Sequence, residues 1–202
     1  NVIIEYANVG VTFYADGNIR NSTVRNNWRG IYFDTPGGSA VNNLVENNSN
    51  IGIYIWNNGA TSPLIEGNTI RNNDRGIYAD WKSSPTITNN EITLNRLGIH
   101  ANGDRNRGGN NPAPVITGNR IYNNTEFNFR TYDIASPGST VMNVTGNWWG
   151  SADVKAILST IYDYSDNGGE AAVADISGFL DGPNGSPVAG NFVTVINQDT
   201  TL

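Results

Sequence analysis

A repeated unit runs through most of this 202-residue chain and limits the fold to architectures built by stacking similar turns. The unit has the form I-x-x-N-x-I-x-x-N-x-x-G-I, where x is any residue. The interval between copies is 21 to 29 residues. Clear copies occur at 19–33, 40–55, 65–79, 87–101 and 116–129, with a degenerate copy at 3–13 and half a copy at 144–149.

Each unit contains three short runs in which apolar and polar residues alternate, separated by Asn or Gly. The runs are too short for one helix per repeat, and they favour β-branched residues, which predicts strands. The leucine consensus of leucine-rich repeats and the helix pairs of ankyrin and tetratricopeptide repeats are absent from the pattern. Three short strands per turn predict an all-β, single-stranded parallel β-helix of about six to seven coils over residues 1–150.

Asparagine supplies 33 of the 202 residues, and the repeats align many of them in two columns. Asn tolerates the left-handed backbone of sharp turns, and its amide can bond to the same group on the next coil. We therefore assign both columns to the corners of the β-helix and not to a ligand site. One column is Ser22, Asn43, Asn68, Asn90, Asn119 and Asn147; the other is Asn27, Asn48, Asn73, Asn95 and Asn124.

Inward-facing apolar residues fall into three further columns that form the predicted core. Burial of each large side chain stabilises the fold by about 1.5–3 kcal/mol. The first column is Val24, Val45, Ile70, Ile92, Ile121 and Trp149, the second is Ile31, Ile53, Ile77, Ile99 and Phe127, and the third is Phe33, Ile55, Ala79, Ala101 and Phe129.

These repeats, and the segment Gly146-Asn147-Trp148-Trp149-Gly150, resemble right-handed parallel β-helix proteins with pectate-lyase-like repeats. Many secreted or surface members of that family close with the letters GNWWG. The resemblance covers about residues 1–180 and implies a right-handed β-helix. It implies no single activity, because the family includes lyases, hydrolases, epimerases, adhesins and binding modules.

Residues 151–202 break the repeat and are predicted to cap the C-terminal end, since a solenoid needs a cap. An irregular last coil over 172–180 and a tail strand over 192–196 follow a short helix expected over 152–162. Ser151 is the expected N-cap. The apolar face of the helix follows helical spacing at Val154, Ile157, Leu158 and Ile161.

Nothing comparable protects the N-terminal end, where Val2, Ile3 and Ile4 begin a coil at once. An open apolar edge of this kind recruits a partner. We expect either further coils of a longer chain or a stacked neighbouring subunit at this end.

Charge and composition exclude several classes of function. A formal charge of −6, with two Lys among the basic residues, argues against binding a nucleic-acid backbone. The absence of Cys excludes disulfides and thiolate metal sites, and no apolar run approaches the length of a membrane span. We predict no cofactor and no metal site; a calcium ion stays possible but unsupported, because it needs several convergent carboxylates and no column supplies more than two. An acidic, Lys-poor chain rich in Asn, Thr and Tyr is typical of secreted or cell-surface proteins.

The third strand of each coil sends one set of residues outward, and this strip is the candidate surface for chemistry. Aromatic rings can cover the C–H faces of sugars while Asp, Asn and Arg bind hydroxyls, so the strip predicts contact with a polysaccharide. Outward ring stacks also stabilise strands by themselves, so a purely structural role stays open. The two predicted columns are Thr12, Tyr32, Tyr54, Tyr78, His100 and Asn128, and Tyr14, Asp34, Trp56, Asp80, Asn102 and Arg130. The candidate carbohydrate-binding residues are Tyr32, Asp34, Tyr54, Trp56, Tyr78 and Trp81, with the polar stretch 104–111 as a groove wall.

The resemblance also implies an enzymatic alternative, a polysaccharide lyase or C5-epimerase acting on a uronate polymer. In related enzymes a base removes the proton beside the uronate carboxylate, which a cation neutralises. Tyr78 or His100 would be base and acid here and Arg130 the partner of the carboxylate, with Asp80 as a further catalytic candidate. The sequence motifs of known epimerases and polygalacturonases are missing. Strand spacing also puts Asp34 and Asp80 about 9.6 Å apart, too far for a retaining glycosidase pair.

Three functions therefore stay open. The first is a structural or polysaccharide-contacting module of a secreted or surface protein, which fits the sequence best. The second is the uronate lyase or epimerase. The third is a self-assembling surface-layer or filament subunit that stacks through its N-terminal coil.

Overall fold

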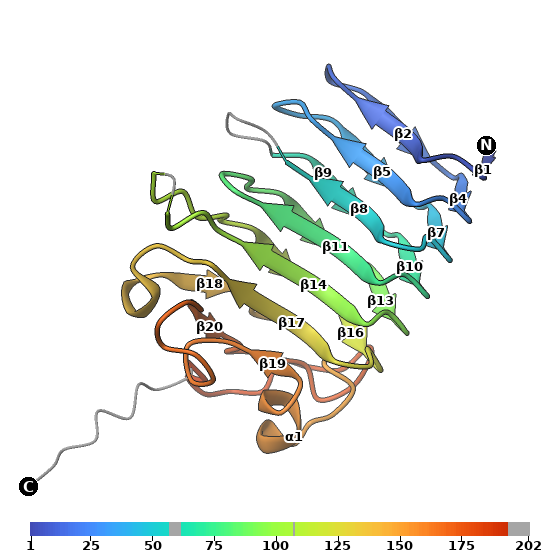
Figure 1. Cartoon of the computed structure of the whole chain (residues 1–202). Helices are drawn as coiled ribbons and strands as arrows, with labels where there is room; N and C mark the ends of the chain where they lie inside the picture. The colour runs from blue at the N-terminus through green and yellow to red at the C-terminus, as the bar shows by residue number, and fades with distance from the viewer. Residues whose placement is uncertain (57–61, 107, 194–202) are drawn as a thin grey trace, which may run out of the picture.

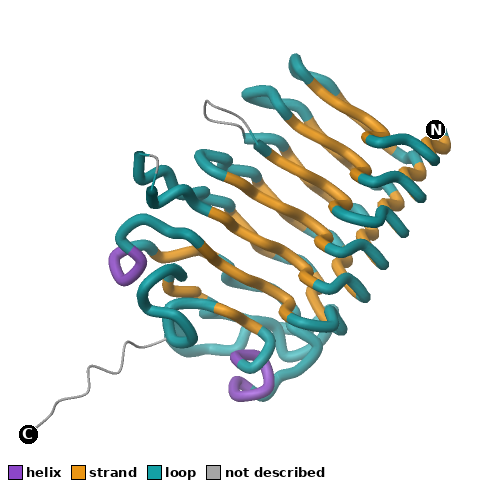
Figure 2. The backbone as a smooth tube through the Cα atoms, in the orientation of Figure 1, coloured by secondary structure: helices purple, strands orange, loops and turns teal. Residues whose placement is uncertain are grey.

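The computed structural model describes residues 1–56, 62–106 and 108–193, and it shows a parallel β-helix whose coils stack along one axis (Figure 1). The coils contribute strands to three parallel sheets of six, seven and five strands. Five coils give a strand to all three sheets, so the predicted six to seven coils are reached only by counting less regular coils at the C-terminal end. Figure 2 shows the strands aligned coil over coil, with the helices near the C-terminal end.

The two sheets of shorter strands hold three-residue segments. The six-stranded sheet contains β1 (Ile3–Glu5), β4 (Thr23–Arg25), β7 (Leu44–Glu46), β10 (Thr69–Arg71), β13 (Glu91–Thr93) and β16 (Arg120–Tyr122). The five-stranded sheet contains β3 (Asn18–Arg20), β6 (Ser39–Val41), β9 (Leu64–Glu66), β12 (Thr86–Thr88) and β15 (Val115–Thr117). A parallel pair, β18 (Val141–Asn143) and β20 (Val173–Asp175), forms a separate two-stranded sheet near the C-terminal end.

The seven-stranded sheet has the longest strands and carries the outward strip. Its members in chain order are β2 (Val9–Phe13), β5 (Arg29–Phe33), β8 (Ile51–Ile55), β11 (Arg75–Asp80), β14 (Leu97–Asn102), β17 (Phe127–Tyr132) and β19 (Ile161–Tyr162).

Both predicted asparagine ladders are present. In each ladder the side-chain oxygen accepts hydrogen bonds from the backbone N–H and the side-chain amide of the asparagine one coil earlier. The side-chain bonds from Asn43 to Asn68 and from Asn48 to Asn73 are both 3.0 Å long. The amide also donates to a backbone carbonyl of the preceding coil, as from Asn43 to Ile19. Buried polar groups are costly unless paired, so the ladders hold the corners together while satisfying their own amides.

The left-handed corner residues are the neighbours of the ladder residues and not the ladder residues themselves. Asn42 and Asn72, with φ of 56° and 55°, immediately precede Asn43 and Asn73. Two chemical requirements therefore explain the paired Asn residues: the first must tolerate a left-handed backbone, and the second must supply a buried amide. The left-handed residues of the two corners are Asn21, Asn42, Gly67, Asn89, Gly118 and Gly146, and Asn26, Asn47, Asn72, Leu94 and Asn123.

The predicted core columns lie inside the β-helix and are almost free of solvent. In the six-stranded sheet Val24, Val45, Ile70, Ile92 and Ile121 are in direct register and fully buried. Ile31, Ile53, Ile77 and Ile99 form the equivalent column of the seven-stranded sheet.

The sixth coil is shifted by two residues relative to the predicted alignment. β14 and β17 pair Ile99 with Phe129 and His100 with Arg130, so the predicted alignments of Phe127 with Ile99 and of Arg130 with Asn102 are wrong. Asn128 is buried, not outward. Each earlier coil has a glycine, such as Gly98, as the second residue of this strand. The sixth coil has Asn128 at that position, and it also has one additional residue between its ladder asparagine and the strand.

The C-terminal cap contains a shorter helix than the spacing predicts. α1 covers Val154–Leu158, and its N-cap is Asp153, whose carboxylate accepts from the N–H of Ala156; the expectations of Ser151 as cap and a helix to 162 are wrong. Ile161 instead begins β19 and pairs with Phe129. The exposed backbone of β17 needs partners, and β19 supplies them in place of a further helical turn. A 3-10 helix, η1 (Pro137–Ser139), precedes β18.

The tail strand predicted over 192–196 is described only as far as Val193, which forms an isolated antiparallel bridge with Asp175; the remaining positions lie outside the described residues. Phe192 packs edge-on against buried Phe179, at 5.2 Å between ring centroids. Among the described residues, no helix combines the length and the apolar character needed to cross a membrane.

Candidate functional site

The outward rings of the seven-stranded sheet form a continuous stack along the axis. Ring centroids are 5.0 Å apart for Tyr32 and Tyr54, 5.3 Å for Tyr54 and Tyr78, and 4.9 Å for Tyr78 and His100. Stacking therefore covers both faces of Tyr54 and Tyr78. A sugar ring cannot lie flat on either ring, and the stack itself stabilises the sheet.

Arginine side chains cover part of this ring stack. The guanidinium carbon of Arg29 lies 4.7 Å from the ring centroid of Tyr54, and that of Arg75 lies 4.9 Å from that of Tyr78. Arg130 lies 4.9 Å from the ring of Tyr132. These distances are typical of cation–π contacts.

The protonation properties of the ring stack do not suit a proton-abstracting site. Burial, followed by the negative charge of Asp80, raises the pKa of Tyr54 and of Tyr78 far above the usual value for tyrosine. Burial, together with Asp34, raises the pKa of Tyr32 to about 12. A tyrosine base needs a lowered pKa, so Tyr78 is a weak candidate for that role.

His100 is buried rather than exposed as the sequence alternation predicts, with 6% of its surface accessible. Burial and the positive charges of Arg75 and Arg130 lower its pKa to about 3, so the imidazole is neutral at pH 7. Neither ring nitrogen has a hydrogen-bond partner among the described residues.

A pocket of about 420 Å³ opens where the strands of the seven-stranded sheet end. Two indoles form its aromatic wall, Trp56 and Trp81, which stack with centroids 5.7 Å apart and planes 13° apart. No further ring stacks on this pair among the described residues, so each indole keeps one face that the other does not cover. The remaining lining residues are Asp80, Asn102, Gly103, Asp104, Asn106 and Asp133.

Hydrogen bonds fix the polar groups of the pocket. The carboxylate of Asp80 accepts from the Tyr54 hydroxyl at 3.0 Å, from the Asn102 amide at 3.1 Å and from the N–H of Trp81 at 3.0 Å. Burial raises the pKa of Asp80 above its usual value. The indole N–H of Trp81 donates to Asp104, which is itself buried. Hydrogen bonds therefore join Asp80, Trp81 and Asp104 in one chain across the pocket.

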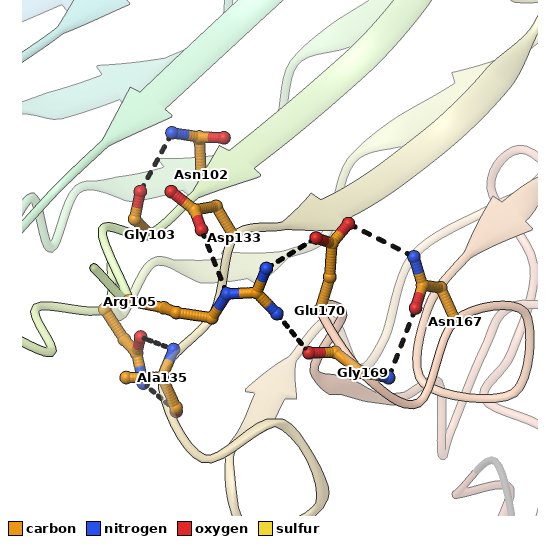
Figure 3. Close-up of polar contacts among 9 residues, drawn as sticks. Asn102, Gly103, Arg105, Asp133, Ala135, Asn167, Gly169 and Glu170 are labelled. Carbon is orange, nitrogen blue, oxygen red and sulfur yellow. Dashed lines mark hydrogen bonds and ion pairs between the residues drawn. The ribbon is translucent and has the colours of Figure 1, made fainter.

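The outer wall of the pocket is attached to the C-terminal cap. Arg105 forms ion pairs with Asp133 at 3.5 Å and with Glu170 at 2.6 Å, and its guanidinium donates to the carbonyl of Gly169 (Figure 3). Figure 3 shows these contacts joining the segment that carries Arg105 to the segment that carries Asn167 and Glu170. The cap thus positions one side of the pocket as well as covering the core.

Within the described residues no group of three or more His, Asp or Glu side chains is arranged to hold a metal ion. The outer face of the six-stranded sheet is occupied by ion pairs instead. Arg25 binds Glu5, Arg71 binds Glu46 and Arg120 binds Glu91, at 2.8 to 2.9 Å.

A family model described as the right handed beta helix region matches residues 9–168, which is most of the chain. The chain belongs to the right-handed β-helix family. Comparisons with curated proteins and with solved structures gave no match. Family membership accounts for the handedness and for the stacked coils, but it assigns no activity, because β-helices carry different sites on one scaffold.

On this right-handed β-helix the predicted site residues fall into two groups. Trp56, Asp80 and Trp81 line the pocket, whereas Tyr32, Tyr54, Tyr78 and His100 form the ring stack beside it. Asp34 lies outside the pocket, two strand spacings from Asp80 in the same column. Arg130 lies next to His100, and not beside Asp80.

Sequence reasoning missed Asp133 as a pocket residue. Its position follows from the register of β14 and β17, because the chain that leaves β17 at Tyr132 runs beside the chain that leaves β14 at Asn102. The two-residue error in the predicted alignment hid this contact. With the correct register, the residues after Asn102 and Tyr132 fall together in the last regular coils.

Proposed function

We propose that this right-handed β-helix is a non-catalytic saccharide-binding module of a secreted or cell-surface protein, and that the pocket beside Trp56 and Trp81 receives the sugar. The observation that carries the proposal is the aromatic wall bordered by polar groups already fixed in place. Saccharide rings combine apolar C–H faces with hydroxyls, and pockets for such ligands join apolar surface to a few oriented polar groups. Asn102 and Asp80 supply those groups here.

The backbone at Trp81 supports a role beyond packing. Trp81 has a φ of 57°, in the left-handed region that bulky residues rarely adopt. A non-glycine residue there costs about 1–3 kcal/mol, and such positions cluster at binding sites. Asn would relieve this strain, as it does at the corners of the ladders, so the indole itself is the reason to keep Trp at this position.

The charge of the pocket favours a neutral or amino sugar over a uronate. Asp80, Asp104 and Asp133 line it, and Arg105, the nearest cation shown to contact them, is already bound to Asp133 and Glu170. A carboxylate on the ligand would meet like charges in a partly buried site, which is unfavourable. An ammonium group would find both carboxylates and indole faces.

Affinity gel electrophoresis with a neutral β-glucan, a chitosan and polygalacturonate tests the proposal. We expect retardation by at least one of the first two polymers, and loss of that retardation in Trp81→Ala. Trp28→Ala is the matched control, since Trp28 is an exposed indole (43% accessible) that does not line this pocket. Equal retardation of the two variants would exclude the pocket as the binding site.

The uronate lyase or epimerase, with Tyr78, His100, Asp80 and Arg130 as its catalytic candidates, is the weaker alternative. The raised pKa of Tyr78 and the burial of His100 both disfavour it. Its test is the ultraviolet absorbance of unsaturated uronate products over a panel of polymers. A signal that Tyr78→Phe abolishes would establish the enzyme and overturn the non-catalytic proposal.

One observation favours assembly as a second function. Ile3 and Tyr6 of the N-terminal coil are 63% and 79% exposed, and β1 and β2 are edge strands with one neighbour each. Such an edge pairs readily with another coil. Light scattering should show mass rising with concentration, and Ile3→Lys should prevent the increase; a constant monomer mass would exclude assembly through this end.

A further inference from the structure

We propose that Arg75, His100 and Arg130 form an oxyanion-binding site on the outer face of the seven-stranded sheet. This site is separate from the pocket at Trp81. Its ligand is a carboxylate, sulfate or phosphate group carried by a partner or present as a free ion.

Polar atoms without partners are concentrated at this place. Both ring nitrogens of His100 and the Nε atoms of Arg75 and Arg130 are buried and make no hydrogen bond among the described residues. Buried polar atoms in folded proteins nearly always have partners, and exceptions require an explanation. A bound oxyanion would provide acceptors for the two Nε–H groups and for the one N–H of the neutral imidazole.

The registry of the strands brings the three side chains together. Arg130 on β17 is the direct neighbour of His100 on β14, and His100 stacks on Tyr78 of β11 at 4.9 Å. Arg75, also on β11, lies over the Tyr78 ring. The strand β14, which carries His100, lies between β11, which carries Arg75, and β17, which carries Arg130. Both guanidinium groups act electrostatically on the imidazole.

Two guanidinium groups at this place lack a close ion pair with any described residue, although the chain as a whole carries −6. The nearest carboxylate to Arg75 is Asp74, at 4.0 Å, and Arg96 holds that carboxylate more closely at 2.6 Å. Arg96 also binds Glu126, and Arg130 makes no ion pair with a described residue. Arg130 therefore has no carboxylate partner among the described residues, and the carboxylate nearest to Arg75 is bound more closely by Arg96.

The exposure and the restricted orientation of the two arginines favour binding of an oxyanion. Arg75 is partly exposed, with 29% of its side chain accessible, and Arg130 is half-buried, so an ion from solvent meets the guanidinium groups before the imidazole. The aromatic contacts of both arginines restrict their orientation, which lowers the entropy lost on binding. A neutral imidazole can donate one N–H without adding charge.

The single histidine of the chain makes the site directly observable. Phosphate, sulfate and acetate are titrated separately at constant ionic strength set with sodium chloride, and the ring resonances of His100 are followed by NMR. We expect a saturable shift for at least one oxyanion. Arg130→Gln and Arg75→Gln should each weaken the apparent affinity about tenfold or more, since each removes charged hydrogen bonds.

Arg120→Gln is the matched control, because Arg120 is an arginine paired with Glu91 on the six-stranded sheet. Its titration should match that of the unmodified protein, and the dispersion of amide resonances verifies the fold of each variant. A shift that grows linearly without saturation, or a saturable shift unchanged in Arg75→Gln and Arg130→Gln, would overturn the proposal. The Trp81→Ala variant should bind the oxyanion normally, so failure here is distinguishable from failure of the saccharide pocket.

Discussion

The side-chain oxygen of Asn128 accepts hydrogen bonds from the backbone and side-chain amides of Asn124, at 3.3 and 2.9 Å. In every earlier coil that acceptor is an asparagine of the next coil, as Asn124 itself is for Asn95 at 3.0 Å. Asn128 lies only four residues away and so ends the ladder within its own coil. Its amide in turn donates to Thr160 at 3.1 Å, which connects the last ladder residue to the cap.

Removal of this terminal acceptor should destabilise the C-terminal coils. Asn128→Ala removes the acceptor of the Asn124 backbone N–H and one acceptor of its side-chain amide, which still donates to the carbonyls of Ile92 and Tyr122. Loss of an acceptor in this partly buried site costs about 1–3 kcal/mol. Urea denaturation followed by circular dichroism measures the change. Thr125→Ala, an exposed neighbour, is the control and should change the midpoint little. Equal midpoints for the two variants would show that the ladder needs no terminal residue.

The corner at Leu94 is a site where the natural residue is not the most stable one. Leu94 has a φ of 58° and is 50% exposed, in a column whose other members at this corner include Asn47, Asn72 and Asn123. A left-handed backbone costs most residues roughly 1–2 kcal/mol and costs Asn less. Leu94→Asn should therefore raise stability by about 0.5–1 kcal/mol.

Thermal unfolding of Leu94→Asn against Val115→Asn checks this prediction. Val115 is an exposed apolar residue of similar accessibility (45%) but lies in strand β15. Asn is unfavourable in strands, so this control should not gain stability. A gain in both variants would attribute the effect to surface polarity and not to the backbone.

The sequence was sufficient for the repetitive part of the fold because each coil repeats the same local requirements. Asn43 and Asn68 each precede the second ladder residue of their coil, Asn48 and Asn73, by about the same short interval, so one correct alignment places both ladders. The alignment failed at Phe127, where the register glycine is absent and one residue is inserted. The predicted extent of the helix was wrong at Ile161, because this residue pairs with Phe129 of a remote strand and that pairing outweighs local helical spacing.

The candidate site was less predictable for the same physical reason. Trp56, Asp80 and Trp81 belong to regular coils, and their shared wall follows from alternation and register. Asp133 and the contacts of Arg105 depend on segments that repeat nothing. His100 is outward by alternation yet buried, with Tyr78 stacked on its ring and Arg130 as its neighbour on the next coil. Alternation alone does not show how far neighbouring side chains cover an outward residue.

The ion pairs of Arg105 should keep the pocket wall ordered locally while contributing little to the free energy of unfolding of the whole protein. Arg105→Ala removes contacts to Asp133, Glu170 and Gly169, all near the surface, where ion pairs contribute about 0–1 kcal/mol to global stability. Hydrogen exchange should nevertheless accelerate at the amides of Asp104 and Gly109, which bond within this segment. Arg71→Ala, which breaks an ion pair on the six-stranded sheet, should leave those two amides unchanged; equal acceleration in both variants would contradict a local role.

Because of His100, the stability of the protein should decrease as the pH is lowered. Its folded-state pKa is about 3, whereas an exposed histidine has a pKa near 6.5. Between these values the unfolded chain binds a proton that the folded chain does not, so the stability present above pH 6.5 is lost as the pH falls toward 3. Each pH unit is worth about 1.4 kcal/mol, which gives a loss of roughly 2 kcal/mol between pH 6.5 and 5. The charged groups that act on the imidazole are Arg75, Arg130 and Arg96.

His100→Phe keeps a ring in the stack and removes the titrating group, so the urea midpoints of the variant should differ little between pH 7 and pH 5. The unmodified protein should lose stability over the same interval. The comparison ends at pH 5 because exposed carboxylates begin to titrate below it and would add their own pH dependence. Parallel losses in the two proteins would assign the pH dependence to groups other than His100 and would contradict burial of a neutral imidazole at position 100.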